Sequence, residues 1–252
     1  MNLYQEFPPH PLLAAHVACL WTSHAFPSGG PVCRRILPDN CIDILWQDRA
    51  PRGFVAGMMS RAHRFETAVP LQTVAVRFLP GAARAFLDLP LQALQDDHPP
   101  LDALWPRHEA EALAAALWER AHGARRRLAI VEAVLLARLR RAAAPAPADR
   151  LVRAAVATIE AAGGAIRIEA LARSLGVSRQ HLALQFRERV GLNPKSFAMV
   201  SRFRKAGAAL QVVPAGQVDW AALALDCGYY DQSHLIHEFR LLADQTPADF
   251  AG

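Results

Sequence analysis

Apolar positions in the first hundred residues fall in short runs that are separated by turn residues. Three of these runs, CIDILW at 41–46, FVAGMM at 54–59 and TVAVRF at 73–78, are rich in β-branched or aromatic side chains. Turn signals such as PDN at 38–40 and PG at 80–81 bound them. Because short runs of this composition between turn signals are typical of strands, the pattern predicts a small β-rich domain.

Farther along the chain the apolar spacing becomes helical. Residues 107–122 and 124–141 place Leu, Ile and Val at helical intervals among Arg and Glu, with Gly123 as the break between them. These helices either pack on the β-rich domain or pair with a second copy of the chain as a homodimer, and the pattern favours neither. The stretch RAAAPAPADR at 141–150 cannot continue a helix, because each proline removes a backbone donor and disfavours helical dihedrals before it.

We therefore predict an α+β protein in two parts, which a chain of 252 residues is long enough to form. Residues 1–141 form a β-rich domain that ends in helices at about 107–141. Residues 142–149 are a Pro/Ala linker, and residues 150–252 form an all-helical domain.

The helical part contains a pseudo-repeat. Its later portion recurs 53 positions along, where Leu182, Phe186, Pro194 and Phe197 become Leu235, Phe239, Pro247 and Phe250. Its earlier portion recurs 52 positions along, where Ile168, Leu171, Ala172 and Gly176 become Trp220, Leu223, Ala224 and Gly228. The difference of one residue falls between the glycine and the next helix, where a turn absorbs it.

Each copy has the features of a helix-turn-helix. The alanine is small where two helices cross closely, and the glycine stands where the chain leaves the first helix and needs a left-handed residue. Ser178 and Asp231 then occupy N-cap positions. Leu182 and Phe186 hold one face of the second helix to the core, which leaves the opposite face free to enter a groove. A single copy is more commonly an ordinary amphipathic helix pair, but two copies in register favour DNA binding.

The region from about 150 to 250 resembles the tandem helix-turn-helix domain of the AraC/XylS family of transcriptional regulators. The residues that carry the resemblance are Leu171-Ala172, Gly176-Val177-Ser178, Leu182, Phe186-Arg187, Gly191, Asn193-Pro194, Arg202, Ala206, Leu210, Gly228-Tyr229, Asp231, Ser233, Phe239-Arg240, Thr246-Pro247 and Phe250. The chain departs from the family at Asp244, where most members carry Gly. Asp tolerates left-handed geometry, so the fold can survive this change.

The resemblance implies that one protein surface places two recognition helices in successive major-groove segments of double-stranded promoter DNA. The residues expected to contact DNA are Ser178, Arg179, Gln180, Ala183, Arg187, Lys195, Arg202, Gln232, Ser233, His237 and Arg240. Arg179 and Gln180 are the best candidates for base readout, because Arg and Gln make bidentate contacts with guanine and adenine. Arg187, Lys195 and Arg202 are phosphate contacts or structural ion pairs. The alternative for each residue is a solvated surface position.

The two copies differ in charge. Residues 167–205 carry a net charge of +7, whereas residues 206–252 carry −5. Because phosphate neutralisation supplies much of the affinity for DNA, we expect the second copy to contribute less than the first. Its acidic surface suggests contact with another protein instead, with RNA polymerase as the partner that the resemblance indicates. A protein-interaction module with weakened DNA binding is the corresponding alternative for the whole chain.

The segments at 34–46 and 74–90 resemble uncharacterised β-rich domains that precede some AraC-type DNA-binding regions, and a cupin-like barrel is one candidate for their fold. Such a domain would modulate DNA binding through a small-molecule effector. Trp46, Asp43 and Arg77 are the candidates for binding it. For Asp43 and Arg77 we favour a structural ion pair, and for Trp46 we favour a place in the core.

The cysteines and the absence of catalytic motifs in the sequence narrow the remaining classes of function. Cys19, Cys33, Cys41 and Cys227 match no disulfide framework or zinc spacing, so reduced thiols are expected and no metal is. A thiol- or metal-responsive regulator that uses Cys33 and Cys41 is a further alternative. No phosphate loop, nucleophile elbow or zinc-protease motif occurs, so we expect neither an enzyme nor a cofactor.

Charge, the length of apolar runs and the first residues bear on where in the cell the protein is expected. The net charge of +5 and the pI near 9.4 permit a polyanionic partner without requiring one. No apolar run approaches the roughly 18 residues of a membrane span, and the start MNLYQEFPPH lacks the features of a secretion signal. The sequence therefore predicts a cytoplasmic protein without membrane contact.

Overall fold

The computed structural model describes residues 2–27, 30–120, 122–142, 144, 146–213 and 216–251. Its strands are β1 (Asn2–Phe7), β2 (Val17–Ala25), β3 (Val32–Ile36), β4 (Ile42–Gln47), β5 (Ala50–Ala56), β6 (His63–Thr67) and β7 (Leu71–Phe78). Five of them form one antiparallel sheet in the order β1-β2-β7-β4-β5, and β3 pairs with β6 separately. The strands of the described residues thus form two sheets that do not close into one barrel.

The three runs predicted as strands overlap β4, β5 and β7, although β5 begins four residues and β7 two residues before the predicted run. β5 ends at Ala56, so the last part of the run at 54–59 lies outside the sheet. The chain at 94–97 crosses there: the Gly57 amide donates to the Asp97 carbonyl, and the Asp96 amide donates to the Met58 carbonyl. This crossing chain takes the hydrogen bonds that a longer strand would have used.

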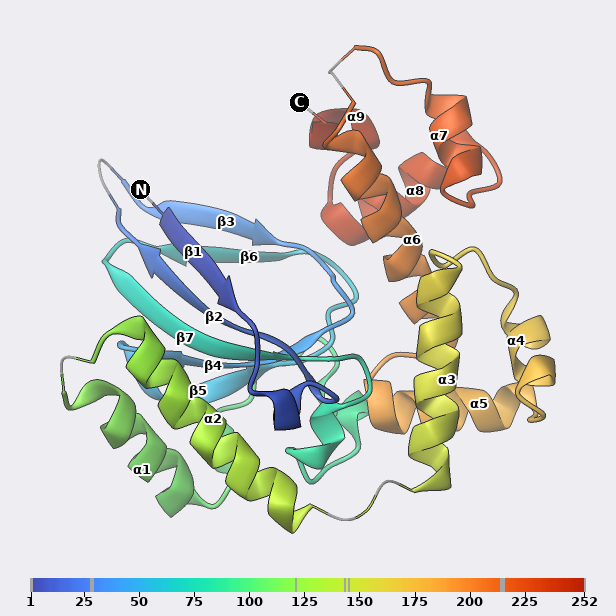
Figure 1. Ribbon diagram of the computed structural model, residues 1–252. Coiled ribbons are helices and arrows are strands. Elements are labelled where there is room, and N and C mark those ends of the chain that lie inside the picture. The colour runs from blue at the N-terminus through green and yellow to red at the C-terminus, as the bar shows by residue number, and fades with distance from the viewer. Residues whose placement is uncertain are drawn as a thin grey trace.

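The helices α1 (Arg107–Trp118) and α2 (Ala124–Arg141) lie side by side against one face of the five-stranded sheet, while the β3–β6 pair lies on the other side (Figure 1). Of the two arrangements left open for these helices, packing on the β-rich domain is therefore present. Short 3-10 helices η1 (Pro11–Leu13), η2 (Ala83–Ala85), η3 (Leu91–Leu94) and η4 (Leu101–Ala103) connect the remaining elements.

The rest of the chain is helical, in agreement with the predicted α+β class. The helices are α3 (Pro147–Ala161), α4 (Ile168–Ser174), α5 (Arg179–Val190), α6 (Pro194–Leu210), α7 (Trp220–Asp226), α8 (Gln232–Ala243) and α9 (Pro247–Ala251). We call residues 147–190 the first unit and residues 220–251 the second unit, with α6 joining them. The predicted linker at 142–149 includes residues 143 and 145, which lie outside the described residues.

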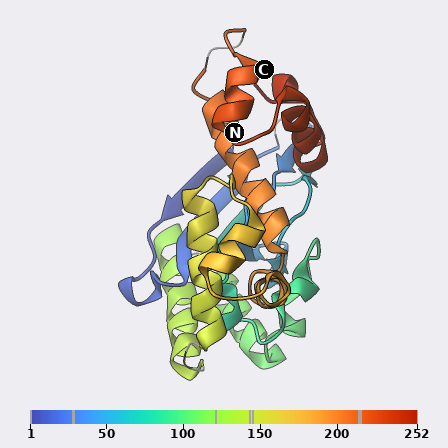
Figure 2. The ribbon, with the colours of Figure 1, turned by 90° about the vertical axis from the view of Figure 1, so that its right-hand side faces the viewer.

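The two units have separate cores. We call the part of the chain before α3 the sheet domain. Phe186 of the first unit and Phe197 of α6 belong to one buried cluster with side chains of the sheet domain such as Leu91. The second unit has its own cluster, in which Phe203 of α6 packs against Phe239. Both views in Figures 1 and 2 place α5 at the N-terminal end of α6 and the second unit at its C-terminal end. The first unit is thus fused to the sheet domain, whereas the second is joined to the rest chiefly through α6.

The fusion depends on a close approach between α5 and the sheet domain. Gly191 ends α5 with a φ of +99°, and a Cβ added to it would lie 3.0 Å from the Leu91 carbonyl oxygen and 3.1 Å from Met58 Cγ. Its counterpart in the repeat, Asp244, ends α8 with a φ of +56°. Asp244 is exposed, and its side chain reaches Arg64 of β6 at 3.7 Å. The left-handed turn is kept in both units, but only the first one needs the space of a glycine.

Candidate nucleic-acid interface

Both helix-turn-helix turns form as the sequence predicts. Gly176 has a φ of +69° and Gly228 a φ of +83°, which are left-handed conformations that glycine adopts without strain. The Ser178 hydroxyl accepts a hydrogen bond from the His181 amide at 3.1 Å, and an Asp231 carboxylate oxygen accepts one from the His234 amide at 2.8 Å. These N-caps fix the start of α5 and α8, the two helices expected to enter the groove.

The inward faces of α5 and α8 are held by the same apolar pattern. Leu182, Phe186, Leu235 and Phe239 all have 0% exposure. Phe186 packs edge-on against Phe197 with ring centroids 5.3 Å apart, and Phe203 does the same with Phe239 at 4.8 Å. Because these faces are locked in the cores, the opposite faces of α5 and α8 point outward.

On the outward side of α5 the predicted contact residues are available. Arg179, Gln180 and Arg187 are exposed, Ala183 is half-buried, and the hydroxyl of Ser178 serves as the N-cap. Sequence reasoning missed Leu184, which is 50% exposed on this helix. An apolar side chain in such a place can contact a thymine methyl group, and its position two residues from the buried Leu182 and Phe186 was the signal.

On α8 the predicted residues Gln232, Ser233, His237 and Arg240 are likewise exposed. Tyr230, directly before this helix, was not singled out from the sequence and is 85% exposed. The described part of α8 thus carries a single cation, Arg240, and exposed apolar side chains such as Leu241 lie beside its polar residues.

The positive residues of the first unit and α6 divide into two groups. Arg189 is only 11% exposed and binds Asp149 at 2.9 Å, and Arg202 is bound to Glu238 of α8 at 2.6 Å. Of the two roles left open for Arg202, the ion pair is the one present in the structure. Arg173 pairs with Glu169. The exposed cations without an ion pair in the described part of these helices and turns are Arg150, Arg153, Arg167, Arg179, Arg187, Lys195, Arg204 and Lys205.

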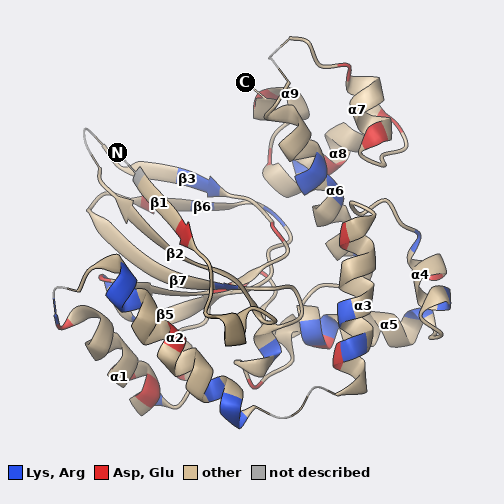
Figure 3. Cartoon of the chain, viewed as in Figure 1, with Lys and Arg blue, Asp and Glu red and all other residues tan. Residues whose placement is uncertain are grey.

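The acidic residues of the second unit are mostly occupied by structural roles. Asp219 caps α7, Asp231 caps α8 and Asp249 accepts from Thr246 at the start of α9. Glu238 is paired with Arg202, and Asp244 lies near Arg64. Figure 3 shows the resulting distribution, with Lys and Arg at both ends of α5 and acidic residues around α7. Half of the six negative charges counted from the sequence thus lie at helix starts, two more are paired with Arg202 and Arg64, and Asp226 lies at the end of α7.

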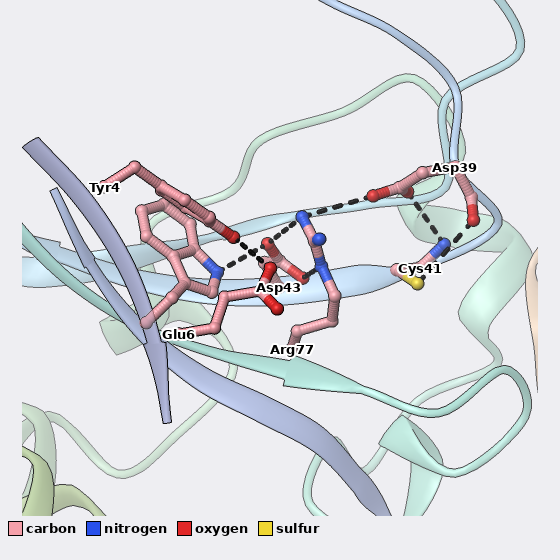
Figure 4. A network of polar contacts seen from close by, with 7 residues as sticks. Tyr4, Glu6, Asp39, Cys41, Asp43 and Arg77 are labelled. Atoms are coloured by element: carbon pink, nitrogen blue, oxygen red, sulfur yellow. Dashed lines mark hydrogen bonds and ion pairs between the residues drawn. The ribbon is translucent and has the colours of Figure 1, made fainter. Parts of the chain in front are cut away.

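The effector candidates Asp43 and Arg77 form the ion pair that we favoured. They face each other across β4 and β7, and the Arg77 Nε and Nη2 atoms donate to the Asp43 carboxylate, each at 3.1 Å (Figure 4). Trp21 Nε1 adds a third donor at 3.1 Å, and Asp39 approaches Arg77 at 3.2 Å. Trp46 is 0% exposed in the core. These three residues thus have structural partners or core positions, and their role toward a ligand stays a prediction.

The cysteines and possible metal ligands show no assembled site. Burial raises the pKa of Cys19 to about 11 and also raises the pKa of Cys41 and Cys227, which works against the thiolate form that reacts or binds metal. Cys33 is exposed. Within the residues that the structure describes, no group of three His, Cys, Asp or Glu could hold a metal ion. In the same part of the chain, every helix is too short or too polar to cross a membrane.

Comparisons with known proteins agree with this reading of the C-terminal region. Residues 171–252 match a family model described as a helix-turn-helix domain, and residues 5–100 match one described as a domain of unknown function (DUF6597). No curated protein is significantly similar to the chain. The helix-turn-helix model is a family of DNA-binding domains, not of enzymes.

Several solved structures of ToxT from Vibrio cholerae are similar to the chain. One is 10% identical, covers 88% of this chain and 97% of that chain, and has a TM-score of 0.44. A second, bound to (E)-4-(8-methylnaphthalen-1-yl)but-3-enoic acid, has the same values. A third, bound to an unsaturated fatty acid, is 9% identical, covers 90% of this chain and 96% of that chain, and has a TM-score of 0.42.

Proposed function

We propose that the chain, whose residues 171–252 match a helix-turn-helix family model, is a transcription regulator of the AraC type that reads specific promoter DNA with α5 and α8 while drawing most of its affinity from α5. The observation that carries the proposal is the distribution of free charge. Arg179 and Arg187 lie exposed and unpaired among the described residues of α5, whereas α8 has Arg240 alone and begins at the carboxylate of Asp231. Because each neutralised phosphate releases counterions, the first unit has the larger electrostatic share of binding.

Base readout falls to the start of each helix. In helix-turn-helix proteins the N-terminal residues of the second helix meet the base edges. Arg179 and Gln180 stand there on α5, and Gln232 and Ser233 stand there on α8. Their exposure supports direct contacts, of which the Arg179 contact with guanine would be the strongest.

The experiment is selection of bound DNA from a random-sequence pool with the full chain, followed by affinity measurements against salt concentration. We expect a motif that spans two groove segments about one helical turn apart. Arg187→Ala should lower the slope of log affinity against log salt by about 1, with Gln232→Ala as a control that leaves the slope unchanged. Failure to enrich any sequence would contradict sequence-specific binding.

Modulation by the sheet domain is the second part of the proposal. The buried cluster that joins η3 to α5 means that a change of packing in the sheet domain reaches a recognition helix directly. A cavity of about 760 Å³ also lies between the sheet domain and the first unit, away from η3, lined by Phe86 and Arg138 on one side and by Arg153 and Arg189 on the other. An effector held in the sheet domain or in this cavity would therefore alter the placement of α5.

Two leucine substitutions test this coupling. Leu91 of η3 and Leu117 of α1 both have 0% exposure, so truncating either one to Ala should cost about 2–5 kcal/mol of stability. Only Leu91 belongs to an element that packs on α5. We expect Leu91→Ala to weaken operator binding at temperatures where both variants are folded, and Leu117→Ala to leave it unchanged. Equal operator affinity for the two variants would contradict coupling through η3.

A further inference from the structure

The cores of the two units are separate clusters that meet along α6, and Leu37 of the sheet domain packs against the core of the second unit. Phe197 and Ala198 of α6 are buried with the first unit, and Val200 and Phe203 with the second, so the cores meet end to end along one helix. A single helix resists bending but allows small rotations of whatever packs around each end. The relative placement of α5 and α8 therefore depends on contacts made directly between the units, together with the exposed sheet-domain contacts of Arg64 with Asp244 and Arg35 with Gln245.

Arg202, at the middle of α6, makes such contacts in both directions. Toward the second unit, its Nη2 and Nε atoms donate to the two carboxylate oxygens of Glu238 at 2.6 and 3.2 Å. Its guanidinium carbon lies 5.0 Å from the centre of the Tyr229 ring. Toward the first unit, its Nη1 atom donates to the Gly164 carbonyl at 3.4 Å. The Arg202 and Glu238 side chains are only 15% and 7% exposed, so the pair is shielded from water and salt.

The turns of the two units also touch. A Cβ added to Gly228 would lie 2.4 Å from the Cβ of Ala165, and one added to Gly164 would lie 2.1 Å from a carbonyl oxygen of α6. The Lys205 ammonium donates to the Asp226 carbonyl at 2.6 Å, which ties the end of α7 to α6. The turn after α3 and the turn before α8 are thus pressed together with no room for another atom.

We propose that this junction, made of Gly164, Ala165, Arg202, Lys205, Gly228 and Glu238, sets the spacing of the two half-sites that the protein accepts. Arg202 is then a positioning residue for α8, not a phosphate contact. The inference rests on the proposed function, because it assumes that α5 and α8 engage DNA together. Its physical basis is that the junction fixes both the distance and the rotation between the two recognition helices.

The geometry of DNA makes this measurable. Adding one base pair between half-sites moves the second by about 3.4 Å and rotates it by about 34°. A rigid pair of units cannot follow both changes, so the wild type should lose affinity on the order of tenfold, the penalty of one wrong base pair. A protein with a loosened junction should follow the displaced half-site with a loss of less than about threefold.

The first test uses operators obtained by selection with the wild type, with one base pair added or removed between the half-sites. Arg202→Gln and Glu238→Gln each break the ion pair, and Glu238 is too buried to reach DNA. We expect both variants, and the double variant, to flatten the dependence of affinity on spacing to the same degree. The proposal is overturned if Arg202→Gln weakens binding evenly at all spacings and lowers the salt slope by about 1 while Glu238→Gln behaves as wild type.

The second test keeps every charge and so stands even if the ion-pair variants fail to fold. Gly228→Ala adds a Cβ that meets Ala165, whereas Gly176→Ala at the equivalent turn meets nothing within 4 Å. Both glycines have similar left-handed φ values of +83° and +69°, so the backbone strain is matched. We expect Gly228→Ala to shift or broaden the preferred spacing and Gly176→Ala to keep it. Unchanged spacing in both variants refutes the junction's role, whereas absence of any selected operator for the wild type refutes the proposed function itself.

Discussion

The two helix-turn-helix units share one geometry but differ in the chemistry of their helix starts. Helices α5 and α6 begin at the neutral caps Ser178 and Asn193, whereas α7 and α8 begin at Asp219 and Asp231. Ser, Asn and Asp are nearly equivalent as N-caps, but only Asp places a negative charge at the helix end that attracts anions. A repeat can therefore keep its fold while one copy loses much of its attraction for phosphate.

The units also differ in what surrounds them. α5 is pressed against η3 of the sheet domain, and its glycine at position 191 has Leu91 and Met58 within about 3 Å of where a Cβ would stand. At the end of α8 the equivalent residue is Asp244, which makes an exposed ion pair with Arg64 of the sheet domain instead of a close-packed contact. One unit is therefore held by a shared core and the other by the junction along α6.

The largest expected effect comes from truncating one aromatic side chain in each core, which tests whether the two cores unfold separately. Phe186→Ala and Phe239→Ala each remove a ring with 0% exposure, which should cost about 3–5 kcal/mol. Because Phe186 belongs to the cluster shared with the sheet domain, its loss should lower the unfolding midpoint of the sheet domain and first unit together. Phe239→Ala should instead release the second unit alone. Hydrogen exchange of backbone amides reads the two patterns, and whole-chain loss of protection in both variants would show that the cores are not separate.

The next effect concerns DNA affinity. Arg179→Ala removes the best candidate for base readout and should weaken operator binding by about 1–3 kcal/mol. Gln232→Ala or His237→Ala should cost less, because the second unit has the weaker electrostatic attraction. Titration of each variant against the selected operator at fixed salt measures the difference. Comparable losses from both units would remove the asymmetry.

A reciprocal exchange of caps isolates the charge from the geometry. Asp231→Ser should leave the stability of α8 nearly unchanged and strengthen operator binding by about 0.3–1 kcal/mol, because a carboxylate leaves the helix start. Ser178→Asp should weaken binding by a similar amount. Changes of the same sign in the two variants would show that charge at the helix start is not what distinguishes the units. Thermal unfolding serves as the control for intact helices.

The smallest effect concerns the end of α8. Asp244→Gly relieves a left-handed residue at a φ of +56° and should stabilise the second unit by up to about 1 kcal/mol. The ion pair with Arg64 that it removes is highly exposed, with 72% and 76% of the two side chains accessible, so little stability is lost with it. The unfolding midpoint measures the gain. Gly191→Ala in the first unit is the counterpart, and it should destabilise, since it adds both strain and overlap.

Local pattern was enough to predict the caps, the left-handed glycines and the inward faces of α5 and α8, because each depends on residues a few positions apart. The partnership of Arg202 with Glu238 could not be predicted in this way, since it joins residues 36 positions apart through the packing of two units. Charge counting found the asymmetry between the units but not that two of the acidic residues are the N-caps of α7 and α8. The shared core of α5 and η3 was also hidden, because Leu91 and Phe186 are ordinary core residues in any reading of their own segments.

The shared core has a consequence for building chimeras. A regulator is often recombined by cutting between its sensory and DNA-binding parts, which here would fall between α2 and α3. Such a cut would strip the cover from Val190 and Leu192, which have 0% and 1% exposure, and leave an adhesive apolar surface on the transplanted domain. A working chimera should carry the segment from η2 to η3 along with the helices, so the boundary for exchange follows the buried surface and not the connecting peptide.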